Sequence, residues 1–254
     1  YLAAIEDELR REPADAFGGP DCAHDSFTDK QKAISYAMTS FFTTGGIRGG
    51  KKKLDKFYPR SFNMGIRRDI YETLGGFSKM RFGEDIDFSI RIFKAGYSCR
   101  LFPKAWVWHK RRTDFRKFWR QVYNSGIARI NLYKKYPDSL KLVHLLPMVF
   151  TLGCAFLAFL FLLGIILFFV LPAGMPQATG LGLSILALQP LILYSFLIFA
   201  DATSKNNSAK IGILSIAAAF IQLTGYGCGF LEAWWKRCVL GKDIFSAYEK
   251  NFYK

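Results

Sequence analysis

Side chains that form disulfides or bind transition metals are scarce in this 254-residue chain. It has three histidines and five cysteines, and no two cysteines are spaced as CxxC. This count and spacing exclude a disulfide framework and argue against a cysteine-rich zinc site. Unpaired cysteines fit a protein that is kept in a reducing compartment.

Charged side chains are absent from three long segments in the second half of the chain. Residues 145–171 form a 27-residue stretch without a charge, and residues 181–200 and 211–231 are also uncharged. Because about 20 apolar residues span the hydrocarbon core of a bilayer, we expect three transmembrane helices within residues 143–233. Their position in the chain excludes a signal peptide.

Positive charge is distributed unevenly around these segments. The loop 172–180 has no Lys or Arg, whereas Lys205 and Lys210 lie in the next loop. The positive-inside rule therefore places loop 172–180 outside and residues 1–142 in the cytoplasm. With three spans the basic tail 234–254 would then lie outside, against the same rule. The sequence leaves open whether the first segment is a re-entrant pair, the tail lies along an interface, or the rule fails.

An intact nucleotide-binding P-loop is also absent. Residues 45–51 fit G-x-x-x-x-G-K, but Lys52 stands where Ser or Thr would bind magnesium. We expect segment 43–53 to be a mobile loop. Residues 1–142 carry 28 Lys and Arg against 16 Asp and Glu, out of a net charge of +15. Such a basic part could face nucleic acid, an anionic membrane surface or a phosphorylated substrate, and the apolar segments argue against nucleic acid.

The remaining pattern predicts an α/β domain. Pro13 ends a helix over residues 1–12, and Gly75 and Gly76 close a short strand and a helix that starts near Arg67. The other predicted elements are a helix over 29–41 capped by Asp29, strands over 97–102 and 106–109, and a basic, aromatic helix from Asp114 to about Tyr136.

An acidic stretch, residues 83–91, stands at the centre of this half. Three carboxylates crowd the start of a predicted helix, and Ile86, Ile90 and Phe93 fall on one face of it. Carboxylates at a helix N-terminus are held ionised by the unpaired N–H groups and the helix dipole. Such a group can take a proton from a hydroxyl or bind a cation, and Asp87 also has the spacing to pair with Arg91.

Four motifs occur in the order that one enzyme family uses. They are Phe17-Gly-Gly-Pro-Asp21, Asn63-Met-Gly-Ile-Arg-Arg68 with Gly75-Gly-Phe77, Gly83-Glu-Asp-Ile-Asp-Phe-Ser-Ile-Arg91, and Val107-Trp-His109 with Phe118-Trp-Arg-Gln121 and Gly126-Ile-Ala-Arg129. Together, residues 17–130 resemble the acceptor half of a family 2 glycosyltransferase domain with the GT-A fold. The last motif resembles membrane-attached members that make extracellular polysaccharides.

This resemblance implies an inverting transfer from a nucleotide sugar, with Asp85 as the general base. Glu84 would position the acceptor, and His109 would stand where some GT-A enzymes place a metal ligand. The implied substrate-binding residues are Gly19, Pro20, Asn63, Arg67, Gln121 and Arg129, of which the last two would hold the diphosphate. The family uses a divalent cation, Mg²⁺ or Mn²⁺, bound mainly through an Asp-x-Asp motif.

The chain departs from this family at two places. The strand–helix units and the Asp-x-Asp motif that should precede Phe17 are absent, so we expect a C-terminal fragment that is inactive alone. Asp85-Ile-Asp87 is itself an Asp-x-Asp, but an apolar strand does not precede it, which favours the general base. Gln121-Val-Tyr-Asn124 lacks the Arg-Trp of the processive Gln-x-x-Arg-Trp signature.

We therefore expect a partial GT-A domain over residues 1–142, transmembrane helices over 143–233 and a basic, aromatic tail over 234–254. The predicted activity is sugar transfer from a nucleotide sugar to a polysaccharide or a lipid-linked glycan. We expect it at the bilayer of a bacterial inner membrane, with the catalytic domain in the cytoplasm and no nucleic-acid partner. The alternative is a non-catalytic membrane scaffold or a degenerate gene product, and the upstream codons distinguish the two.

Overall fold

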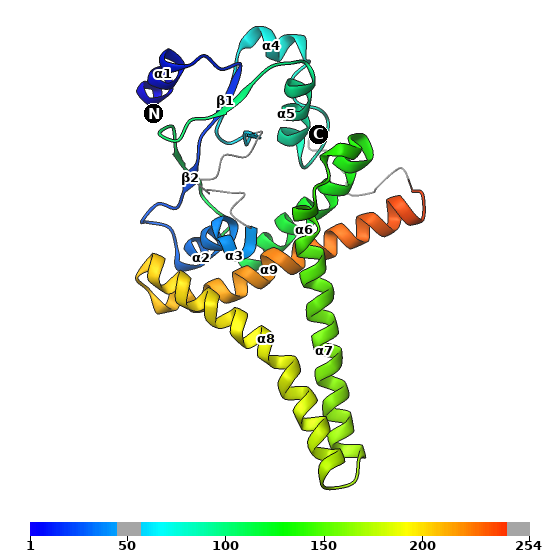
Figure 1. The fold of residues 1–254 in the computed structure, drawn as a ribbon. Helices are drawn as coiled ribbons and strands as arrows, with labels where there is room; N and C mark the ends of the chain where they lie inside the picture. The colour runs from blue at the N-terminus through cyan, green and yellow to red at the C-terminus, as the bar shows by residue number, and fades with distance from the viewer. Residues whose placement is uncertain (45–56, 243–254) are drawn as a thin grey trace.

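The computed structural model describes residues 1–44 and 57–242, and Figure 1 shows their arrangement. Most of the glycine-rich segment 43–53 lies outside the described residues, as does the end of the tail. The strands are β1 (Ala16–Gly18), β2 (Asp21–Cys22), β3 (Met64–Ile66), β4 (Cys99–Leu101) and β5 (Val107–Trp108). The α-helices are α1 (Leu2–Arg11), α2 (Asp29–Thr39), α3 (Phe41–Thr44), α4 (Arg68–Thr73), α5 (Glu84–Lys94), α6 (Phe115–Lys135), α7 (Leu146–Val170), α8 (Met175–Asn206) and α9 (Ala209–Trp234).

A small mixed sheet organises the first half of the chain. Its strand order is β3-β1-β4, with β1 antiparallel to β3 and parallel to β4. Strands β2 and β5 form a separate parallel pair. The mixed sheet, its helices and the three long apolar helices agree with the predicted fold class. The strands near residues 97–109 are shorter than predicted, because Pro103 and the turn at Ala105 separate two brief pairings.

Helix α5 packs on this sheet through a different face from the predicted one of Ile86, Ile90 and Phe93. Phe88 and Ile92 are fully buried against Ala16 of β1, and Met64 and Ile66 of β3 border the same cluster. The helix ends at Lys94, and Gly96, two residues later, has a φ of +84° that suits glycine. This packing fixes the acidic N-terminus of α5 relative to the sheet.

The N-cap residue of helix α2 lies one position before the predicted one. Thr28, not Asp29, is the N-cap, and its hydroxyl accepts a hydrogen bond from the Gln31 N–H while the Gln31 side chain accepts one from the Thr28 N–H. Asp29 instead pairs with Lys210 at 2.7 Å, at the start of α9. The prediction of Asp29 as the cap is wrong because its carboxylate has a cationic partner from a distant helix.

Helix α9 lies between the first half of the chain and the other apolar helices. On one side it packs against α2 and α6, in clusters that include Ile34, Phe118 and Ile211. A second cluster joins Ile130 of α6 to Phe230 of α9. Figure 1 shows α9 running across the bottom of the domain, with α7 and α8 projecting away from it.

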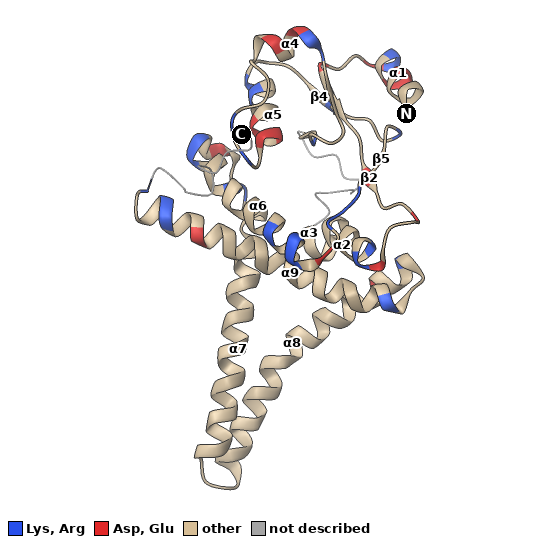
Figure 2. Cartoon of the chain, turned by 180° about the vertical axis from the view of Figure 1, so that it is seen from behind, with Lys and Arg blue, Asp and Glu red and all other residues tan. Residues whose placement is uncertain are grey.

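Helices α7 and α8 form an antiparallel hairpin whose projecting part carries no charge (Figure 2). All three helices α7, α8 and α9 are long and apolar enough to cross a membrane. Helix α8 is longer than the predicted span, because it starts at Met175 and continues past Asp201 and Lys205 to Asn206. Consequently the loop predicted over 172–180 is mostly helical.

Candidate functional site

The N-terminus of α5 is held close to α6 by Gly83. This glycine has a φ of +82°, a left-handed conformation that side chains disfavour. A Cβ added there would lie 3.3 Å from Cδ1 of Leu132 and 3.5 Å from Cβ of Ala128, both in α6. The turn therefore lets the acidic end of α5 approach the middle of α6.

The two aspartates of the first turn have different surroundings. Asp87 is fully buried, and its carboxylate accepts hydrogen bonds from Lys135 Nζ at 2.6 Å, Arg91 Nε at 3.0 Å and the Tyr136 hydroxyl at 3.0 Å. The predicted pairing of Asp87 with Arg91 is thereby confirmed. Because Lys135 is the last residue of α6 and Tyr136 follows it, these hydrogen bonds hold α5 to α6.

The Asp85 carboxylate has a looser partner. Arg60 Nη1 lies 3.5 Å from its Oδ2, and 13% of the Asp85 side chain is exposed. Its Oδ1 accepts the Ile86 N–H at 2.8 Å, while its backbone carbonyl accepts the Ser89 hydroxyl. Asp85 is therefore oriented and close to solvent, which a group that must accept a proton requires.

Glu84 lies beside Asp85 in a partly buried position. Burial raises the pKa of Glu84, and the neighbouring Asp85 carboxylate adds to the rise, while Arg60 opposes it. A carboxyl group of this kind is suited to binding a hydroxyl by accepting or donating a hydrogen bond.

Cationic groups gather near this acidic pair. His144, just before α7, has its pKa lowered to about 3 by burial and then by the positive charges of Arg129, Lys141 and Arg60. The buried Nε of Arg129 has no hydrogen-bond partner within the described residues. At neutral pH His144 is therefore uncharged, and the positive charge near the acidic end of α5 comes from Arg60 and Arg129.

The predicted turn at residues 18–20 is a tightly packed scaffold. A Cβ on Gly19 would lie 1.7 Å from the Ala105 carbonyl oxygen, so only glycine fits. Asn63 is buried, and its Nδ2 donates to that same carbonyl at 2.9 Å and more weakly, at 3.5 Å, to the Pro20 carbonyl. The Tyr1 hydroxyl donates to Asn63 Oδ1 at 2.7 Å. In this structure the Asn63 amide joins three segments of the chain.

His109 lies at the end of β5, next to Asp21 and Arg111. Its Nδ1 is 3.1 Å from Asp21 Oδ2 and 3.1 Å from Arg111 Nη1, and Arg111 Nη2 is 2.5 Å from the same carboxylate oxygen. The described residues contain no group of three or more His, Cys, Asp or Glu that could hold a metal ion. Because the buried Arg111 guanidinium already pairs with Asp21 and would repel a cation, His109 and Asp21 do not fit a metal site among the described residues.

Two predicted substrate-binding residues, Arg67 and Gln121, have their polar groups paired with residues away from the acidic end of α5. Arg67 is 57% exposed and pairs with Asp69 at 2.6 Å and Asp15 at 3.2 Å. Gln121, in α6, accepts a hydrogen bond from Arg112 Nε at 3.2 Å. Within the part of the chain that the structure describes, neither residue bonds to the acidic end of α5, with which Arg60 pairs instead.

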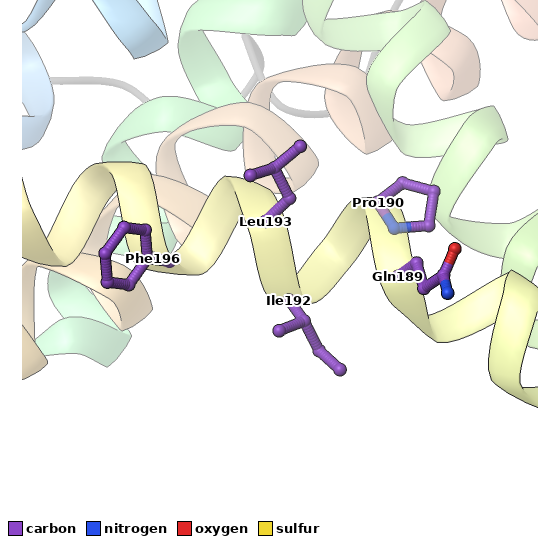
Figure 3. Close-up of a pocket in the computed structure, with 5 residues that line it drawn as sticks. All are labelled: Gln189, Pro190, Ile192, Leu193 and Phe196. Carbon is purple, nitrogen blue, oxygen red and sulfur yellow. The ribbon is translucent and has the colours of Figure 1, made fainter.

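A hollow on α8 is separate from the acidic site. It is lined by Gln189, Pro190, Ile192, Leu193 and Phe196, drawn in Figure 3. Four of these side chains are apolar and none titrates, so the hollow offers contact surface and no acid or base.

Sequence comparison identifies the family of this chain. The model of "Glycosyl transferase family group 2" matches residues 61–200, more than half of the chain. The chain belongs to this glycosyltransferase family. The match includes Asp85, helices α6 and α7 and most of α8, so these segments belong to one family unit.

A curated glycosyltransferase shows the same relationship over a shorter length. The protein named probable glycosyltransferase YdaM, from Bacillus subtilis (strain 168), is 38% identical over 71 residues. These residues are 28% of this chain and 16% of that protein. The chain therefore matches a small part of its relative's length.

Sequence reasoning missed three residues of this site. Arg60 pairs with Asp85, Arg111 is buried against Asp21, and His144 lies near Arg129. No local pattern marks them, because their partners are 25, 90 and 15 positions away in the sequence. Their neighbour Arg129, in contrast, was indicated by the sequence, because it belongs to the Gly126–Arg129 motif.

Proposed function

We propose that this chain is the acceptor-side part of a membrane-bound inverting glycosyltransferase, with Asp85 as the general base. The observation that carries the proposal is the contrast between the two aspartates of α5. Asp87 is buried and bonded to Arg91, Lys135 and Tyr136, whereas the one ion pair of Asp85 is at 3.5 Å and its side chain borders solvent. The family assignment supports glycosyl transfer as the reaction.

Asp85 would act on the hydroxyl group of the acceptor. As the acceptor oxygen attacks the anomeric carbon, its O–H bond breaks and Asp85 takes the proton. A new C–O glycosidic bond forms on one face while the bond to the nucleotide diphosphate breaks on the other. A single carboxylate suffices because no covalent enzyme intermediate forms. Glu84 would hold the acceptor hydroxyl beside this base.

The cations near Asp85 support an anionic group at the acceptor side. Arg60 lies beside the acidic pair, and the charges of Arg60 and Arg129 both act on the neutral His144, which lies two residues before α7. This placement favours either the departing diphosphate or the phosphate of a lipid-linked acceptor. Arg129, with its unpaired buried Nε, is the residue that we assign to that phosphate.

We further propose that the bilayer is that of a bacterial inner membrane. The part of the chain before the apolar helices, residues 1–142, is here named the catalytic half, and we propose that it faces the cytoplasm. Three apolar helices long enough to span a membrane support membrane association. A nucleotide-sugar donor and a glycan or lipid-linked acceptor are the expected partners. The divalent cation that the family resemblance implies stays a prediction, with no ligand assigned to it among the described residues.

The test is sugar transfer by membranes that carry the full-length gene product. Radiolabelled nucleotide sugars are supplied in turn, and incorporation into glycan or lipid is measured. Loss of a general base lowers kcat by about 10²–10⁴-fold, so Asp85→Asn should lose transfer while donor binding persists. Transfer by this variant at the wild-type rate would refute the assignment of Asp85.

Asp87→Asn provides the matched control two residues away. It removes a carboxylate from the same helix turn but not from the proposed reaction. When equal amounts of folded protein are compared, we expect its kcat to stay within about threefold of wild type, because no proton moves to Asp87. A wild-type protein that transfers sugar from none of the donors would favour the non-catalytic scaffold.

A further inference from the structure

The contacts between the apolar helices show on which side of the membrane their ends must lie. Near the tip of the hairpin, a Cβ on Gly164 of α7 would lie 2.6 Å from the Gly180 carbonyl oxygen and 2.4 Å from Ser184 Oγ in α8. The Ser184 hydroxyl also donates to the Phe161 carbonyl at 3.1 Å. These helices are therefore antiparallel and tightly packed. If the hairpin crosses a membrane, the start of α7 and the end of α8 are on one side.

Helix α9 connects those two ends. A Cβ on Gly212, in its first turn, would lie 2.0 Å from Thr203 Oγ1 near the end of α8. A Cβ on Gly227 would lie 2.0 Å from Thr151 Oγ1 in the second turn of α7. These contact points are 15 residues apart, or about 22 Å along the helix axis. Both ends of this stretch of α9 are thus on the same side of the membrane.

The opposite face of α9 is attached to the catalytic half. A Cβ on Gly229 would lie 2.0 Å from the Tyr123 carbonyl oxygen, and one on Gly126 would lie 2.1 Å from the Tyr226 carbonyl oxygen. Such close backbone approach joins α9 to α6 over its second half. Over its first half, α9 packs against α2 through Ile211.

Polar contacts attach both ends of α9 to the same half of the chain. Lys210, at its start, pairs with Asp29 of α2 at 2.7 Å. Arg237, just past its end, donates a hydrogen bond to Asn131 of α6. Helix α6 also exposes charged side chains that would be costly to place in hydrocarbon. If α9 crossed the bilayer, the attached α6 and its charged side chains would have to enter the hydrocarbon core.

We propose that α9 lies in the membrane interface on the side of the catalytic half, and that only α7 and α8 cross the bilayer. The inference is independent of the glycosyl-transfer proposal, because it rests on helix contacts alone. All three helices have the length and composition to span, and their contacts select which two do so. Figure 1 agrees, since α9 runs crosswise to the projecting hairpin.

This arrangement removes the conflict in the positive-inside rule. Lys236, Arg237 and Lys242 fall on the same side as Lys205 and Lys210. The hairpin tip, without Lys or Arg, is on the other side. Trp234 and Trp235 are 44% and 54% exposed at the end of α9, where indole rings suit a headgroup layer.

The test is labelling of single cysteines by a membrane-impermeant maleimide in the full chain. One protein keeps the exposed native Cys238 as its sole cysteine. In two matched proteins Cys238 is also replaced, and the cysteine is supplied by Ala173→Cys at the hairpin tip or by Lys104→Cys in the catalytic half. Each is compared in intact cells and in inverted membrane vesicles.

We expect Cys238 and Lys104→Cys to label in one membrane orientation and Ala173→Cys in the other. Labelling of Cys238 together with Ala173→Cys would overturn the proposal, because the tail would then lie across the membrane from the catalytic half. Labelling of all three from one side would also overturn it, because the hairpin would not cross. The pattern should be identical in Asp85→Asn, so failure of the catalytic proposal would leave this result unchanged.

Discussion

Asp87 offers the most direct test of how α5 is held, because its carboxylate is fully buried in the described structure. Its Oδ2 accepts a hydrogen bond from Arg91 Nε at 3.0 Å. Its Oδ1 accepts one from Lys135 Nζ at 2.6 Å and one from the Tyr136 hydroxyl at 3.0 Å. Asp87→Asn keeps the size of the side chain and one acceptor oxygen but removes the negative charge.

The expected loss of stability follows from the exposure of the two cations. Removing one partner of a buried ion pair costs about 3–5 kcal/mol. Lys135 is 46% exposed, so water can solvate its ammonium group after the substitution, and this makes the expected loss of stability smaller. Arg91 retains hydrogen bonds to the Leu74 and Gly76 carbonyls at 2.6 and 2.5 Å. We therefore expect Asp87→Asn to lower the free energy of unfolding by about 2–3 kcal/mol.

The pH dependence of this loss has a definite sign. Burial acts to raise the pKa of Asp87, but hydrogen bonds from Lys135 and Tyr136 outweigh it, so the net pKa is lowered. A carboxyl whose pKa is lower in the folded state stabilises the fold above its unfolded pKa of about 4. That contribution disappears as the pH falls from about 4 through the folded pKa. The difference between wild type and Asp87→Asn should shrink over this range.

The assay is unfolding of the detergent-purified full chain by denaturant at neutral pH and again below pH 4. Asp85→Asn is the control, because its carboxylate has one ionic contact at 3.5 Å and we expect a change below about 1 kcal/mol. An Asp87→Asn protein as stable as this control at neutral pH would refute the reasoning. A stability difference that persists unchanged in acid would contradict the role of the charge.

Three further predictions concern packing, substrate binding and the metal. Gly126→Ala should destabilise by about 1–3 kcal/mol in thermal unfolding, because its Cβ would lie 2.1 Å from a carbonyl oxygen of α9. Gly153→Ala, with nothing within 4 Å, should not, and equal losses would contradict the close crossing. Arg60→Ala should raise the acceptor KM about tenfold, because a charged hydrogen bond of about 1.5–3 kcal/mol is lost, whereas the exposed Arg67→Ala should leave KM unchanged. His109→Gln should not alter the half-saturating Mn²⁺ concentration of the full-length enzyme, and an increase would restore His109 as a ligand.

Much of the acidic site is predictable because its signals are local. Three carboxylates at the start of an amphipathic helix, followed by Gly96, specify α5 within a few residues. The i, i+4 spacing of Asp87 and Arg91 identifies their ion pair, which lies at 3.0 Å. Arg60 and His144 carry no such signal, since their positions depend on how separate segments fold together. The capping of α2 illustrates the same limit, because Lys210 draws Asp29 into an ion pair.

The apolar helices separate the two kinds of information. Composition alone determined that residues 145–171, 181–200 and 211–231 can enter a bilayer, because each is apolar and long enough to span it. As helices, these segments also hydrogen-bond their backbone polar groups internally, which hydrocarbon requires. Composition does not distinguish a helix that crosses the bilayer from one that lies along its surface. The tertiary structure supplies that distinction through the glycines of α9, whose backbone approaches α6, α7 and α8 at once. Those contacts join residues far apart in the chain, so only the folded arrangement decides which helices are free to cross.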